Sequence, residues 1–329
     1  MTLPPLVRRL AAAAVLLAAA SPAVAASGKL VLYTSQPDKT AAETVAAFNK
    51  AEPNVAVEIF RSGTTEIMNK LEAELVAGAP QADVLFIADA VTMEQLKADN
   101  RLLPFPEADV SALPPEAYDA DRTYFGSKLI TTGIMYNTAA PKKPSSWLDL
   151  LAPEAKGQVI LPSPLYSGAA AIHMAALGGD PALGGQYYEK LASNGAVSAR
   201  GNGAVNSAVA GGQKMYGVIV EFMALNAKAK GSPVDFVFPK EGVTAVTEPV
   251  AILKTAKNQE AAKAFVSFIL SKEGQQLAAR QGFLPARKDV APPPGFPPVD
   301  ELHIIPVDLA RAMREDEALK KRFSELFGG

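Results

Sequence analysis

Short apolar runs alternate with amphipathic segments along the first third of the chain. Residues 29–34, 55–60 and 82–87 are rich in β-branched, aromatic and other apolar side chains, and each run has the length of a buried parallel strand. Between these runs apolar residues recur at spacings of three and four, as in Ile67 and Leu71, which predicts helices with one buried face. The alternation predicts an α/β unit with a parallel, doubly wound sheet.

A second unit of similar plan follows, with strands predicted over 157–162, 196–199 and 215–220. Two further apolar runs, 126–138 and 244–253, are predicted to cross between the units as strands. Two crossings between two α/β lobes make a hinged clamp, with a ligand cleft between the lobes.

The predicted boundaries follow from the crossing strands. Residues 26–131 together with 246–329 form lobe 1, and residues 132–245 form lobe 2. The last helix, predicted over about 307–327, packs across the lobes.

Polar loops end all three strands of the first unit. Ligands of open α/β sheets bind at the carboxyl ends of strands, and the unpaired amides of the following helix N-termini attract anions. Helix capping explains any one of these residues equally well. The loop after Arg61 contains more hydroxyl groups than helix capping requires, and for this loop capping and ligand binding are equally favoured. The predicted ligand-binding residues of this unit are Ser35, Ser62, Gly63, Thr64, Thr65 and Asp89.

The second unit repeats this arrangement at its own strand ends. Ser163, Ser167 and Gly168 lie in the loop after its first strand, and Asn202 precedes a helix that it is predicted to cap. Glu221 follows the strand 215–220 directly. These five residues complete the predicted ligand-binding set.

Other conspicuous side chains of the second unit are predicted to pack rather than bind. Trp147 opens a short helix, and Tyr187 and Tyr188 lie within a longer one. His173 follows a run of small residues in a helix and is predicted to be buried or partly buried.

Composition removes several kinds of function. The formal net charge is −2 and no long basic run occurs, which argues against a nucleic-acid partner. The chain has no cysteine and two histidines, so neither disulfides, thiolate chemistry nor a histidine-rich metal site is expected. No Gly-x-Ser-x-Gly elbow, P-loop or His-Glu-x-x-His is present. A binding protein is therefore favoured over an enzyme, and an enzyme over a structural scaffold.

The first 25 residues follow the secretory pattern. Arg8 and Arg9 precede an apolar run over 10–20, and Ala23-Val24-Ala25 offers a cleavage site. The run falls short of the roughly 20 apolar residues that span a bilayer. We expect cleavage near Ala25 and export of a free, monomeric chain into the periplasm.

The order of these segments resembles the extracytoplasmic solute-binding proteins of ABC importers, in the group that binds ferric ion, 2-aminoethylphosphonate or sugar phosphates. The similarity covers nearly the whole exported chain. It rests on residues 29–35, 62–65, 83–89, 133–137, 147–151, 156–157, 163–168, 202–206, 215–221, 261–265 and 271–274. The resemblance implies a type II periplasmic-binding-protein fold, a membrane permease as partner, a small-molecule ligand and no cofactor.

The loop after Val220 is the position that separates ligands in this group. Ferric binders present adjacent tyrosines near this position, whereas this chain has Glu221 and Phe222. Iron is therefore the weaker expectation, and a phosphorylated or phosphonated solute is favoured. Glu221 would repel a plain anion, so 2-aminoethylphosphonate, whose ammonium Glu221 would bind, is preferred over a sugar phosphate. A structural salt bridge is the alternative role for Glu221.

Overall fold

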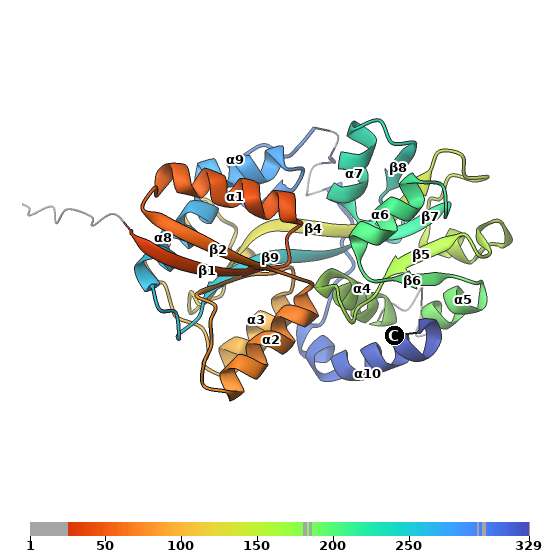
Figure 1. The fold of residues 1–329 in the computed structure, drawn as a ribbon. Coiled ribbons are helices and arrows are strands. Elements are labelled where there is room, and N and C mark those ends of the chain that lie inside the picture. The colour runs from red at the N-terminus through yellow and green to blue at the C-terminus, as the bar shows by residue number, and fades with distance from the viewer. Residues whose placement is uncertain (1–25, 180–182, 184–185, 295, 298–300, 329) are drawn as a thin grey trace, which may run out of the picture.

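The computed structural model describes residues 26–179, 183, 186–294, 296–297 and 301–328, and the predicted signal sequence at 1–25 lies outside them. Two lobes lie side by side, joined by two long strands (Figure 1). This is the predicted two-lobed α/β architecture. In the described part of the chain, no helix combines the length and the apolar character that a membrane span requires.

The first lobe contains the predicted alternation of strands and helices. Its strands run parallel because each connecting helix returns the chain to the end of the sheet where the previous strand began. β1 pairs in parallel with β2 on one side and with β3 on the other. The elements are β1 (Gly28–Thr34), α1 (Asp38–Ala51), β2 (Val55–Arg61), α2 (Thr64–Val76), β3 (Val84–Phe86), α3 (Ala90–Ala98) and the short η1 (Pro115–Ala117).

The second lobe follows the same plan. β5 pairs in parallel with β6 and with β7. The elements are η2 (Trp147–Leu151), η3 (Pro153–Ala155), β5 (Val159–Pro162), α4 (Gly168–Gly179), α5 (Tyr187–Ser193), β6 (Val197–Ala199), α6 (Asn202–Ala210), β7 (Tyr216–Val220), α7 (Glu221–Ala229) and β8 (Val234–Val237).

The joining strands are β4 (Tyr124–Asn137) and β9 (Thr244–Ile252). β4 pairs with β9 along its first part and with β7 and β8 along its last part, always antiparallel. The sheet order is β2-β1-β3-β9-β4-β7-β5-β6. Two parallel halves therefore meet through an antiparallel centre, because strands that run out to the second lobe and back point in opposite directions.

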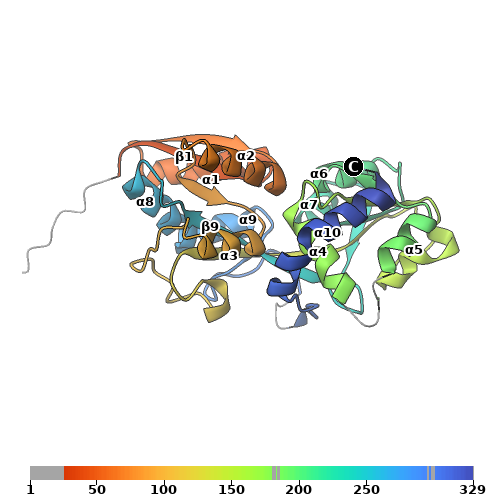
Figure 2. The same cartoon turned by 90° about the horizontal axis from the view of Figure 1, so that it is seen from below.

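The C-terminal part covers both lobes. α8 (Gln259–Leu270), α9 (Lys272–Arg280) and β10 (Leu284–Pro285) lie with the first lobe. α10 (Leu309–Phe327) packs against α4 and α5 and also against α3, as predicted for a helix that spans the lobes (Figure 2). Its Phe323 is fully buried and contacts the ring of Tyr188.

Trp147, Tyr187, Tyr188 and His173 of the second lobe are core residues. Trp147 is fully buried and its Nε1 donates to the carbonyl of Gly242 at 2.9 Å. Tyr187 and Tyr188 are buried in the same apolar cluster. His173 lies against Trp147, and burial lowers the pKa of His173 to about 3. The packing predictions for these four residues are confirmed.

Candidate functional site

A cavity of 230 Å³ lies where the two lobes face each other beside the joining strands. Residues of both lobes line it, including Ser35 and Arg61 from the first and Tyr166 and Asn202 from the second. The floor includes Glu248 of β9. The cleft predicted between the lobes is therefore present, and it is walled by the carboxyl ends of several strands.

Six of the eleven predicted binding residues line this cavity, and five do not. Those that line it share positions at the first turn of a helix or in the loop before it. They are Ser35, Gly63, Thr64, Ser167, Gly168 and Asn202.

The N-terminus of α4 forms one wall of the cavity. Ser167 Oγ accepts hydrogen bonds from the amide of Ala170 at 3.3 Å and from Asn202 Nδ2 at 3.1 Å. Gly168 leaves no room for a side chain, since a Cβ there would lie 2.7 Å from the carbonyl oxygen of Ala88. The free amides of this helix end and the Ser167 hydroxyl can therefore donate to an oxyanion.

Asn202 has a different role from the predicted one. α6 starts at Asn202 itself, and its N-cap, Gly201, makes no side-chain cap. The Asn202 carboxamide instead donates to Ser167 Oγ and accepts from the amide of Val220 at 3.2 Å. The prediction of an N-cap is wrong because the side chain links α4 to β7 across the cavity wall.

Arg61 is the cation of the first lobe that enters the cavity. Its Nε donates to the carbonyl of Gln36 at 2.8 Å, and its Nη1 donates to the hydroxyl of Tyr166 at 3.0 Å. The nearest carboxylate is that of Asp38, 3.8 Å away and largely exposed. Because its hydrogen bonds go to neutral acceptors, the positive charge of Arg61 is poorly compensated and remains available to an anion.

Tyr166 closes the cavity between the lobes. A Cβ at Gly63 would lie 2.4 Å from the ring of Tyr166, and a Cβ at Gly201 would lie 2.8 Å from it. The guanidinium of Arg200 lies over the same ring at 4.5 Å. Glycines on both sides therefore allow one aromatic ring to bridge the two lobes.

Ser62 is used outside the cavity. Its hydroxyl donates to Glu66, and this hydrogen bond is the main cause of the lowered pKa of Glu66. Arg200 donates to both oxygens of Glu66, at 2.8 and 3.0 Å. Ser62 thus supports an ion pair between the lobes at the rim instead of contacting the cavity.

Three more predicted residues lie beside the cavity. Asp89 caps α3 by accepting from the amide of Thr92 at 3.2 Å, and burial raises its pKa. Thr65 Oγ1 lies 3.4 Å from the carbonyl of Pro164, and Ser163 Oγ accepts from the amide of Leu165 at 3.2 Å. Asp89 and Ser163 therefore have the local capping and turn roles that were the alternative for them, whereas Thr65 contacts the second lobe.

The structure does not place Glu221 in the cleft, where the most specific prediction had put it. Its side chain is fully buried, and its Oε2 accepts from the amide of Thr131 on β4 at 2.6 Å. It does not line the cavity, although both neighbours, Val220 and Phe222, do. At the first position of α7 the side chain folds back onto β4, away from the cleft. No ion pair of Glu221 is found among the described residues either, so the salt-bridge alternative also fails.

The carboxylate that does line the cavity is Glu248, which was not predicted. Its Oε2 lies 2.7 Å from Lys128 Nζ and accepts from Gln36 Nε2 at 3.0 Å. Glu248 lies in the middle of an apolar strand pattern, and nothing in that pattern marks which face of β9 meets the cleft. Gln36 follows Ser35 in a loop that was already identified, so position in that loop was the available signal.

The described residues contain no group of three or more His, Cys, Asp or Glu side chains placed to hold a metal ion. Tyr166 is the tyrosine that lines the cavity, and its hydroxyl accepts from Arg61. The tyrosine pair at 187–188 is buried in the core. The cavity thus offers hydrogen-bond donors for an anion rather than a set of hard oxygen ligands.

Comparison with known proteins gives consistent matches over most of the chain. The family model described as bacterial extracellular solute-binding protein matches residues 43–299. The Fe(3+)-binding periplasmic protein of Serratia marcescens is 25% identical over 279 residues, covering 82% of this chain and 81% of its own length. The putative 2-aminoethylphosphonate-binding periplasmic protein of Salmonella typhimurium is 26% identical, covering 75% and 74%.

The solved structures agree on the fold. The periplasmic binding protein AfuA from Actinobacillus pleuropneumoniae, with fructose-6-phosphate bound, has a TM-score of 0.82 at 23% identity and covers 91% of this chain and 98% of its own. The ligands named for these three proteins differ chemically. The choice among them therefore depends on the residues that line this cavity.

Proposed function

The chain belongs to the family of bacterial extracellular solute-binding proteins, the non-enzymatic capture components of ABC importers, and we propose that its solute is a small phosphonate or phosphate, with 2-aminoethylphosphonate as the best candidate. The protein acts in the periplasm and hands the solute to a membrane permease. Removal of residues 1–25 on export, and a monomeric state, belong to the proposal.

The observation that carries the proposal is the donor set around one small cavity. Arg61 supplies a poorly compensated cation, and the α4 N-terminus supplies amides together with the Ser167 hydroxyl. Hydrogen bonds from charged donors and helix ends are the usual means of holding a phosphoryl or phosphonyl group. This support comes from the residues of this chain and does not depend on the ligands named for its relatives.

The cavity volume favours a solute with few heavy atoms. At 230 Å³ it lies below the range of roughly 300–1,000 Å³ that is typical of pockets for drug-sized ligands. 2-Aminoethylphosphonate has a two-carbon chain and needs less of this volume than a hexose phosphate does. Glu248 in the lining also disfavours a plain dianion, because a like charge is repelled.

A sugar phosphate is the second candidate, because its hydroxyls would also donate to Glu248. Ferric ion is the third, and the lack of a suitable ligand cluster among the described residues weighs against it. Closure of lobe 1 (26–131 with 246–329) on lobe 2 (132–245) about the joining strands would enclose the solute in each case.

A thermal-shift screen tests the proposal. The panel contains 2-aminoethylphosphonate, ethylphosphonate, glucose 6-phosphate and ferric citrate. A ligand at 100 times its dissociation constant adds about 2.7 kcal/mol of stability, so a true solute gives a clear shift. We expect the largest shift with 2-aminoethylphosphonate. A shift with ferric citrate alone would overturn the proposal.

A further inference from the structure

The floor of the cavity contains a buried ion pair at an irregularity of the sheet. The register between β4 and β9 shifts between Gly126 and Leu129, which is the pattern of a β-bulge. Lys128 lies within the bulge, and Glu248 lies opposite it on β9. Bulges redirect side chains and are common beside functional sites. Here the bulge brings two charged side chains together below the cavity.

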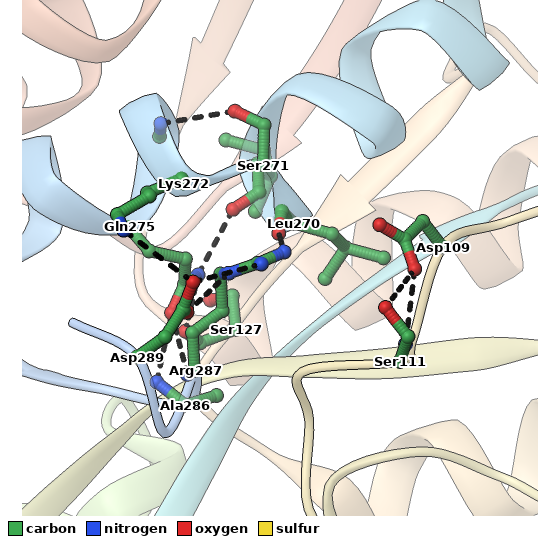
Figure 3. A network of polar contacts seen from close by, with 12 residues as sticks. Asp109, Ser111, Ser127, Leu270, Ser271, Lys272, Gln275, Ala286, Arg287 and Asp289 are labelled. Atoms are coloured by element: carbon green, nitrogen blue, oxygen red, sulfur yellow. Dashed lines mark hydrogen bonds and ion pairs between the residues drawn. The ribbon is translucent and has the colours of Figure 1, made fainter.

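Hydrogen bonds from β4 to β9 and from α9 stabilise the bulge. Ser127 Oγ donates to the carbonyl of Glu248 at 2.8 Å. Gln275 of α9, itself 1% exposed, donates to the carbonyl of Ser127 at 2.7 Å and accepts from the amide of Ala286 at 2.8 Å (Figure 3). The backbone around Lys128 and Glu248 is therefore held by hydrogen bonds from within the sheet and from α9.

The two oxygens of the Glu248 carboxylate have different surroundings. Oε2 is shared by Lys128 Nζ and Gln36 Nε2. Oε1 has no hydrogen-bond partner among the described residues, and it is not one of their fully buried unpaired atoms, so it keeps contact with solvent although the Glu248 side chain is only 3% exposed. Because Glu248 lines the cavity, a solute that enters the cavity can replace water as the donor to Oε1.

Lys128 is occupied on its other sides. Its Nζ lies 3.7 Å from the ring centroid of Phe283 and 5.1 Å from that of Phe86. Burial lowers the pKa of Lys128, and the adjacent Glu248 opposes that change. Lys128 thus balances the carboxylate without itself lining the cavity.

Gln36 links Arg61 and Glu248, two of the three charged residues that line the cavity. Its backbone carbonyl accepts from Arg61, and its side chain donates to Glu248. A cation and a carboxylate therefore lie on either side of a single residue. Both charges line the same cavity, which suits a solute that carries a negative and a positive group.

We propose that Glu248 determines specificity by accepting, through Oε1, a hydrogen bond from a protonated amine of the solute, while Lys128 and Gln36 position its carboxylate. The proposal rests on the function given above and names the group that selects an aminated solute over its unaminated counterpart. It assigns to Glu248 of β9 the role that the sequence pattern had placed on Glu221.

Calorimetry on matched ligand pairs tests this role. The pairs are 2-aminoethylphosphonate with ethylphosphonate, and β-alanine with propionate, which differ within each pair by the amine. Wild type should favour the aminated member by about tenfold or more, and Glu248→Gln should reduce that preference to about threefold or less, because a charge-assisted hydrogen bond becomes a neutral one. Glu221→Gln is the matched control, because it removes a buried carboxylate outside the cavity, and its preference should equal that of wild type.

Two further arms make the outcome unambiguous. Lys128→Met/Glu248→Gln removes both charges, so a repulsive Lys128 cannot explain a lost preference, and the double variant should also lose it. Retention of the wild-type preference in folded Glu248→Gln or in the double variant would overturn the proposal. If wild type binds neither phosphonate, the proposed function fails, and the β-alanine pair then decides about Glu248. No amine preference in that pair would overturn this inference as well.

Discussion

Two buried carboxylates lie against β4, and their surroundings differ in almost every respect. Glu248 has a lysine at 2.7 Å, a glutamine donor and an oxygen directed to a cavity. Glu221 has no cation partner among the described residues, and its contacts are backbone amides, including that of Thr131. Its Oε1 is buried without a partner.

This difference separates a charge used for recognition from one retained in the scaffold. At Glu248 the cation of Lys128 lies 2.7 Å from a carboxylate that lines a ligand cavity. At Glu221 burial raises the pKa to about 8, and the amides of the α7 N-terminus only partly oppose that change. A carboxylate at the end of a strand is thus not a ligand group by position alone. Orientation and counter-charge decide its role.

The largest effect should come from breaking the Glu248 pair. Lys128→Met leaves a buried carboxylate without its cation, which typically destabilises a protein by about 3–5 kcal/mol. Lys128→Met/Glu248→Leu removes both charges and should recover most of the free energy of unfolding. Urea denaturation measures both variants. Equal stability of Lys128→Met and wild type would show that this pair is not desolvated as described.

The second-largest effect should be a pH dependence of stability that is caused by Glu221. The folded-state pKa of Glu221 is raised above its unfolded value of 4.5 to about 8, so its contribution to stability is fully present below pH 4.5 and is lost as the pH rises to 8. Glutamine at this position does not titrate. The stability of wild type relative to Glu221→Gln should therefore fall between pH 5 and pH 8, by on the order of 1–3 kcal/mol.

Urea denaturation at several pH values checks this prediction. A difference between the two proteins that stays constant, or that grows in favour of wild type as the pH rises, would contradict the described burial of Glu221.

The smallest effect should come from a carboxylate that is paired but exposed. Glu66 binds Arg200 across the rim, and its side chain is 44% exposed. Glu66→Gln should lower the free energy of unfolding by at most about 1 kcal/mol, since exposed ion pairs contribute little. Added salt should reduce the difference further. If Glu66→Gln lowered the free energy of unfolding as much as Lys128→Met does, burial would not be the cause of the difference between the exposed and the buried ion pair.

The sequence predicted well those features that depend on local pattern. The alternation of apolar runs identified both lobes and the joining strands, because periodicity is set by burial on one face. Ser167 and Thr64 were identified for a similar reason, since residues that follow strands and start helices gather at one edge of a parallel sheet. These parts of the site need no knowledge of distant contacts.

The sequence did not predict features that depend on distant pairing or on rotamer. Ser127 and Glu248 are 121 positions apart, and the bulge that joins their strands has no local signature. Arg61 meets Tyr166 over a separation of 105 positions. Glu221 was placed at the correct strand end, but the direction of its side chain depends on how α7 starts against β4. Strand ends therefore locate a cleft better than they identify which side chains enter it.

The central claim, capture of a small solute by lobes that meet at Tyr166, is tested most directly by calorimetry of Gly63→Ala with 2-aminoethylphosphonate. Gly63 has a φ of −66°, which alanine adopts without strain, but its Cβ would lie 2.4 Å from Tyr166 of the other lobe. The substitution should weaken binding by about tenfold or more, whereas Gly178→Ala, whose Cβ meets nothing within 4 Å, should stay within about threefold of wild type. Wild-type affinity in Gly63→Ala would contradict closure around the solute.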